Sequence, residues 1–126
     1  MPYAITWTEN TFLAEFVGTI TARDIEAVNH VFSGDARMDD VRYSIWDFSH
    51  ASSIEIPEHE IEEAAAFDKG VSIVRQTLRG ALIASNDQVK GCLEKYLAMA
   101  SNLDVHWDTR LFDDIETARG WLEKHS

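Results

Sequence analysis

Apolar and polar residues alternate along this chain with two different periods. In some segments the apolar residues form a compact run or occupy every second position, which is typical of β-strands. In others they recur every three or four positions, which is typical of helices. The strand-like segments are residues 4–7, 12–17, 41–46, 78–84 and 105–112. A helical segment follows the second strand and each later one, so the pattern predicts the element order ββαβαβαβα.

Residues that commonly begin helices support this assignment of strands and helices. Serine, threonine, asparagine and aspartate side chains bond the free N–H groups of a first turn, and proline fits there because it lacks one. Such residues begin all four helical segments: Thr21 with Asp24, Pro57, Asn86, and Asp113 with Asp114. The end of the second helix stays open, because Gly70 could end it or it could continue toward Val74.

Strands that alternate with helices predict an α/β fold, with a mostly parallel sheet covered by about four helices. The first two strands are separated only by a short turn at Glu9 and Asn10. They therefore predict an N-terminal β-hairpin and one antiparallel edge. With 126 residues and 45% hydrophobic residues, the chain predicts a single domain that spans residues 1–126.

The charge limits the partners that this domain can have. The chain carries 22 acidic and 11 basic residues, and its net charge is −11. Such a surface repels nucleic acid and anionic lipid, and it favours a basic protein partner if it does more than keep the domain soluble. Cys92 is the one cysteine, so no internal disulfide can form. No signal peptide or membrane span is expected, and the simplest location is the cytoplasm.

The candidate site is a polar cluster where two neighbouring strands are expected to end. Asp47, Ser49 and His50 follow one apolar run, and Ser85 and Asn86 follow the next. Ligands of open α/β sheets bind beyond the carboxyl ends of parallel strands. We therefore expect these side chains to converge and to bind a ligand or partner. Residues 47–57 are interpreted as a loop with a recognition role.

Catalysis, metal binding and a cofactor are less favoured by the sequence. Asp47, Ser49 and His50 are the residue types of a hydrolytic triad, but neighbours on an extended chain point apart and no G-x-S-x-G turn is present. The histidines form no zinc motif, and His59 with Glu62 fits an exposed helix face. No cofactor is expected. Cys92 and the four tryptophans are interpreted as packing residues.

Several short motifs together resemble the SpoIIAA-like proteins, which are relatives of STAS domains. They are GTITARD at 18–24, WDFS at 46–49, RGALIA at 79–84, and Leu111-Phe112 with Ala118 and Trp121-Leu122. The resemblance implies a bacterial, largely uncharacterised protein with a STAS-like fold. Anti-sigma-factor antagonists of this kind carry a phosphorylated serine at a helix start. This chain has Ser53 and Glu58 there without the Asp-Ser and Gly of that motif, which argues against the switch.

Three functions therefore follow in order. The first is a non-enzymatic binding or interaction module of the STAS-like type, with a regulatory role. The second is the binding of a lipid or other small amphiphile, since the family's fold also resembles CRAL-TRIO lipid-binding domains. The third is a hydrolase that uses Asp47, Ser49 and His50. The exposed edge of the hairpin, with Trp7 and Phe12 as apolar surface, also predicts a homodimer.

Overall fold

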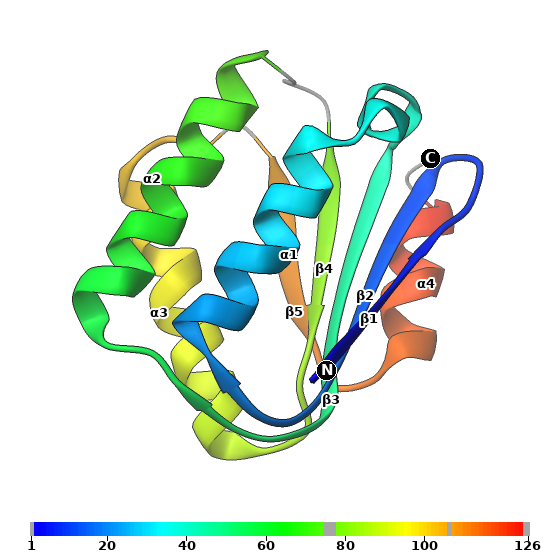
Figure 1. The fold of residues 1–126 in the computed structure, drawn as a ribbon. Helices are drawn as coiled ribbons and strands as arrows, with labels where there is room; N and C mark the ends of the chain where they lie inside the picture. The colour runs from blue at the N-terminus through cyan, green and yellow to red at the C-terminus, as the bar shows by residue number, and fades with distance from the viewer. Residues whose placement is uncertain (1, 75–77, 106, 125–126) are drawn as a thin grey trace.

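A five-stranded sheet forms the centre of the protein (Figure 1). The structure is a computed structural model that describes residues 2–74, 78–105 and 107–124. The strands lie in the order β1-β2-β3-β4-β5, and β1 is antiparallel to β2 while the other neighbours are parallel. Their bounds are Tyr3–Trp7, Thr11–Thr21, Tyr43–Glu55, Arg79–Ile83 and Asp108–Phe112. The predicted element order and mostly parallel sheet are confirmed.

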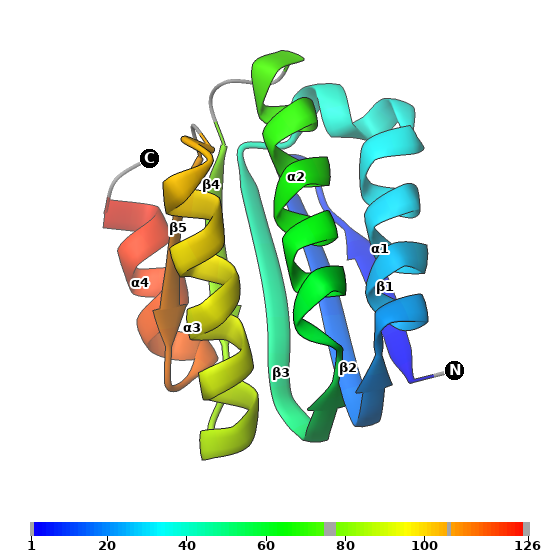
Figure 2. The ribbon, with the colours of Figure 1, turned by 90° about the vertical axis from the view of Figure 1, so that its left-hand side faces the viewer.

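The helices form unequal layers on the two faces of the sheet (Figures 1 and 2). Helices α1, α2 and α3 each connect a strand to the neighbouring parallel strand, so right-handed crossovers place all three on one face. The last helix, α4, follows β5 and covers the other face. The helices span Ala22–Gly34, Glu58–Val74, Asp87–Asn102 and Ile115–Lys124, and a short 3₁₀ helix spans Ala36–Asp40.

The core is divided by the sheet into two clusters. The smaller one lies under α4 and is centred on Ile45, Ile83 and Leu122. The larger one lies under α1 to α3 and is rich in aromatic side chains. In this larger cluster the rings of Phe16 and Phe48 stack with their centroids 4.3 Å apart. The aromatic rings of neighbouring strands thus form the floor on which the three helices rest.

The helix starts match the predicted caps. Asp24 accepts hydrogen bonds from the backbone N–H and the hydroxyl of Thr21, and Asn86 accepts one from the backbone N–H of Val89. Asp114 accepts one from the backbone N–H of Thr117. The open question about the second helix is also answered, because α2 continues past Gly70 to Val74.

One prediction about the third strand is wrong. Residues 47–55, interpreted as a loop, are the second half of β3 and pair with β2 as far as Thr21 and Glu55. The register shifts twice, each time with one extra residue in β3. Such β-bulges break the alternation of a strand, so Phe48, Ala51 and Ile54 all reach the same core at intervals of three. That spacing is not a strand pattern, which explains the error.

Three smaller predictions also need correction. Residues 41–42 precede β3, and Val41 is a buried residue that ends the 3₁₀ helix. Residue 105 and Trp107 precede β5. The N-terminal hairpin does not offer the expected apolar surface, because Phe12 is fully buried and the Arg37 guanidinium lies over the Trp7 ring, 4.7 Å from its centre.

Candidate functional site

Part of the predicted polar cluster comes together, at the end of the sheet where β4 stops. The Ser85 hydroxyl donates to the backbone oxygen of Ser49 at 3.2 Å, and the Asn86 amide donates to that of Ser52 at 2.8 Å. The Asp47 carboxylate is buried and accepts a 2.9 Å hydrogen bond from the backbone N–H of Ser49. His50 is exposed. Asp47, Ser85 and Asn86 thus hold backbone groups in place.

Gln88, which the sequence analysis missed, completes this arrangement. Its amide accepts a hydrogen bond from the backbone N–H of Ile54 at 2.8 Å and donates one to the Ile54 oxygen at 2.7 Å. Strand β4 pairs with β3 only as far as Asp47. Side chains at the start of α3, Asn86 and Gln88, therefore bond the second half of β3 in place of the missing strand.

A cavity of about 310 Å³ lies elsewhere, between α1 and α2 above the centre of the sheet. Residues of β3 and β4 form its floor, and Cys92, Leu93 and Tyr96 of α3 close one side. Aromatic side chains contribute much of the wall: Phe32, Trp46, Phe48, Phe67, Tyr96 and Trp107. Cavities that bind small molecules commonly measure about 300 to 1,000 Å³ and have mostly apolar walls with a few polar groups.

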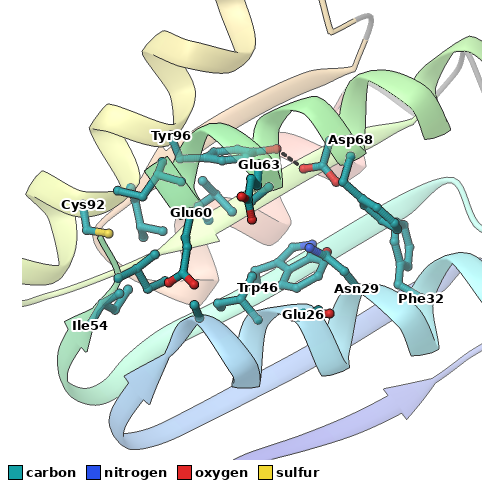
Figure 3. Close-up of a pocket in the computed structure, with 18 of the residues that line it drawn as sticks. Glu26, Asn29, Phe32, Trp46, Ile54, Glu60, Glu63, Asp68, Cys92 and Tyr96 are labelled. Atoms are coloured by element: carbon teal, nitrogen blue, oxygen red, sulfur yellow. Dashed lines mark hydrogen bonds between the residues drawn. The ribbon is translucent and has the colours of Figure 1, made fainter. Parts of the chain in front are cut away.

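A pair of titratable groups lies in the wall of the cavity (Figure 3). The Tyr96 hydroxyl on α3 donates a hydrogen bond to the Asp68 carboxyl on α2. Burial raises the pKa of Asp68 to about 6, and the hydrogen bond from Tyr96 opposes that shift. Burial, together with the nearby Asp68 charge, holds the pKa of Tyr96 well above its usual value. Burial thus makes the Asp68 carboxyl easier to protonate than an aspartate in water.

Asn29 is a second polar residue of the cavity wall. It lies on α1, is only 8% exposed, and its side chain lines the cavity (Figure 3). Within the described residues its amide group has no hydrogen-bond partner. Its amide atoms are not among the fully buried side-chain atoms that lack a partner, so a bound molecule could accept from the amide and donate to it.

Acidic side chains surround the opening of the cavity. Glu26 lies on α1, and Glu60 and Glu63 reach from α2 toward α1 (Figure 3). His30 is also on the α1 side, 3.7 Å from the Glu26 carboxylate, and its ring makes an edge-on contact with the ring of Phe67 on α2. Among the described residues that line the cavity there is no lysine or arginine. Its electrostatic environment is therefore negative.

The sequence contained only weak signals of this cavity. Trp46 and Cys92 were interpreted as packing residues, and both line it. The sequence analysis did not consider which glutamates of α2 face α1. Helical spacing does place Glu60, Glu63 and Phe67 on one face of α2. That face could have been found, but its position opposite α1 depends on the tertiary packing.

The structure also bears on metal binding and on membrane insertion. In the described part of the chain, no three histidine, cysteine or acidic side chains gather closely enough to hold a metal ion. His106 and His125 lie outside the described residues. None of the described helices is both long and apolar enough to cross a membrane.

Comparison with known proteins identifies the fold. The structure of the anti-sigma factor antagonist SpoIIAA in its unphosphorylated form has a TM-score of 0.65 and 12% identity, over 98% of this chain and 97% of that one. The fold is SpoIIAA-like. The phosphorylated form of the Bacillus cell fate determinant SpoIIAA gives a TM-score of 0.61 at 12% identity, over 98% and 99% of the two chains.

A third SpoIIAA-like structure is also similar to this chain. It is an uncharacterised protein of the DUF3478 family from Shewanella loihica PV-4, with a TM-score of 0.52 and 17% identity over 95% of this chain and 91% of the other. No family model and no curated protein matches the sequence. At these identities the likeness to the SpoIIAA-like structures establishes the fold.

Proposed function

We propose that this chain is a non-enzymatic binding module of the STAS-like type, and that it holds a small apolar molecule between α1 and α2. The cavity carries this proposal, because it is large enough for a ligand and has mostly apolar walls. The unpartnered Asn29 amide supplies a polar group that could orient the ligand. This is the small-molecule alternative of the sequence analysis, now given a location.

The arrangement at the strand ends supports a role without catalysis. Asp47 is directed to the backbone of Ser49, whereas an acid of a hydrolytic triad orients a histidine. His50 is exposed on a neighbouring position of the same strand. A serine nucleophile also needs a sharply turned backbone, and β3 is extended at Ser49.

The cavity can be tested by filling it. The chain would be titrated with N-phenyl-1-naphthylamine, a neutral apolar dye that fluoresces in dry sites. We expect one saturable site in the parent, no site in Ala64→Trp, and an unchanged site in Ala66→Trp. Ala64 lines the cavity, whereas Ala66 is an exposed position on the same helix. Equal binding by the two variants, or none by the parent, would refute the proposal.

A regulatory role through a protein partner is the second candidate. Its support is the similarity to an anti-sigma factor antagonist over nearly the full length of both chains, since an antagonist of that kind acts on other proteins. The net charge of −11 favours a basic partner. This second candidate also includes a bacterial origin and a cytoplasmic location for the chain.

The exposed end of β2 and β3 offers a place for such a partner. Val17 is 50% exposed and pairs in register with His50. A photo-crosslinking residue placed at Val17 should capture one protein in cells of the source organism, and the same residue at Asn10, at the opposite end of β2, should not. Identical adducts from both positions would count against a specific partner at this end.

A further inference from the structure

The charged side chains of the cavity determine which ligands it favours. Glu26, Glu60, Glu63 and Asp68 line it, and no lysine or arginine among the described residues does. A carboxylate or phosphate ligand would meet these negative charges with no lysine or arginine to pair with, and like charges repel one another even at exposed positions such as Glu26. Fatty acids and phospholipids are therefore poor candidates, although their chains would fit apolar walls.

The same charges favour a cation. Glu26 and Asn29 are three residues apart on α1, and Glu60 and Glu63 have the same spacing on α2, so each pair shares a helix face. Both faces line the one cavity. An ammonium group between them could donate to carboxylates and to the Asn29 oxygen. Trp46 and Phe67 also line the cavity, and aromatic rings attract cations.

The cation that fits is organic. A divalent metal ion needs several ligand atoms converging on one point, and the described side chains offer no such group. Carboxylates spread around an apolar space instead suit a molecule with a charged end and an apolar body. The aromatic wall favours a flat body, since offset and edge-on ring contacts are favourable.

We propose that the cavity between α1 and α2 selects hydrophobic amines, which combine a protonated amino group with an aromatic or other compact apolar body. The proposal rests on the proposed function, because it adds the charge and chemical class of the ligand to the same site. The amino group lies among Glu26, Asn29, Glu60 and Glu63, and the apolar body lies against Trp46 and Phe48.

The test uses three molecules of nearly the same shape and different charge. Calorimetry near neutral pH and low salt would measure binding of 1-naphthylmethylamine, 1-naphthylmethanol and 1-naphthoate. We expect the amine to bind about tenfold more tightly than the alcohol, and the carboxylate to bind more weakly than both. Alcohol binding equal to amine binding would refute the charge preference and leave the cavity site intact. Binding of none would refute both, and tightest binding of the carboxylate would reverse the charge preference.

A pair of double variants tests where the preference arises. Glu60→Gln with Glu63→Gln should weaken amine binding about two- to fivefold and leave alcohol binding unchanged. Glu58→Gln with Glu62→Gln removes the same charge from the same helix at exposed positions that do not line the cavity. This control pair should change neither affinity. Equal losses in the two pairs would show only the effect of overall charge and would refute the site.

Discussion

The Tyr96 hydroxyl donates a hydrogen bond to the Asp68 carboxyl across the gap between α3 and α2. The two residues are separated by 27 others along the chain, and both line the cavity. Burial raises the pKa of Asp68 to about 6, and the hydrogen bond from Tyr96 opposes that shift. The pair thus makes one wall of the cavity depend on pH.

Replacing Asp68 by asparagine should change how stability depends on pH. The folded pKa of Asp68 is about 6 and the unfolded value is 3.8, so the folded state retains the proton over that range. Protonation therefore favours folding at low pH, and this contribution is lost as the pH rises from about 4 to about 6. Relative to the parent, Asp68→Asn should gain about 3 kcal/mol of unfolding free energy over that interval.

Urea denaturation at a series of pH values measures this difference. Asp39→Asn, at an exposed position, controls for the loss of one negative charge. A difference between Asp68→Asn and the parent that stays constant with pH would contradict the raised pKa.

Asp47 should matter for stability far more than its neighbours. Its replacement by alanine removes the carboxylate that accepts from the part-buried backbone N–H of Ser49, and we expect a loss of about 1–3 kcal/mol. Ser49→Ala and His50→Ala should each cost well under that in thermal denaturation. The parent and these two variants would also be screened for esterase and phosphatase activity. Turnover by the parent that disappears in both variants, without a change in melting temperature, would restore the hydrolase hypothesis.

Gln88 should be needed for the second half of β3. Gln88→Ala removes both the acceptor and the donor for the backbone of Ile54, so we expect a loss of about 1–3 kcal/mol. Lys95→Ala, an exposed change on the same helix, should cost little. Hydrogen exchange would show faster exchange of the Ile54 amide in Gln88→Ala. Unchanged protection of that amide would mean that β3 does not depend on Gln88.

The structure retains one of the two features that predicted self-association, the open edge of the hairpin, and removes part of the other, the apolar surface. We propose a homodimer formed through β1, which pairs only with β2 and leaves its outer edge open in the described chain. The burial of Phe12 removes one of the apolar residues expected at that contact. Light scattering at roughly tens of micromolar, a range that detects weak dimers, should give twice the chain mass. A monomer mass would contradict the proposal.

The elements that could be predicted from the sequence are those determined locally. The caps at Thr21, Asn86 and Asp114 involve partners three residues away, and the strand order follows from short connections. The bulges of β3 could not be predicted in the same way. Each bulge places one extra residue of β3 opposite β2. The side of the sheet that Ala51 faces therefore depends on the register with β2, which the sequence of β3 alone does not reveal.

The candidate site could likewise be predicted from the sequence only in part. Asp47, Ser85 and Asn86 were correctly expected at one end of the sheet, yet their hydrogen bonds are to the backbone of β3. The cavity joins α1, α2, α3 and the floor of the sheet, which are distant in sequence. Its position depends on how the two helices are rotated on the sheet, and no short motif encodes that rotation.

Nuclear magnetic resonance decides most directly between the cavity and the strand-end cluster. Isotope-labelled protein would be titrated with 1-naphthylmethylamine, and the shifts of backbone, Asn29 amide and Trp46 indole signals would be followed. The account predicts saturable shifts at Asn29, Trp46 and Tyr96, with Ser85 and Asn86 unchanged. Shifts confined to Ser49, His50, Ser85 and Asn86, with the cavity signals unmoved, would contradict it.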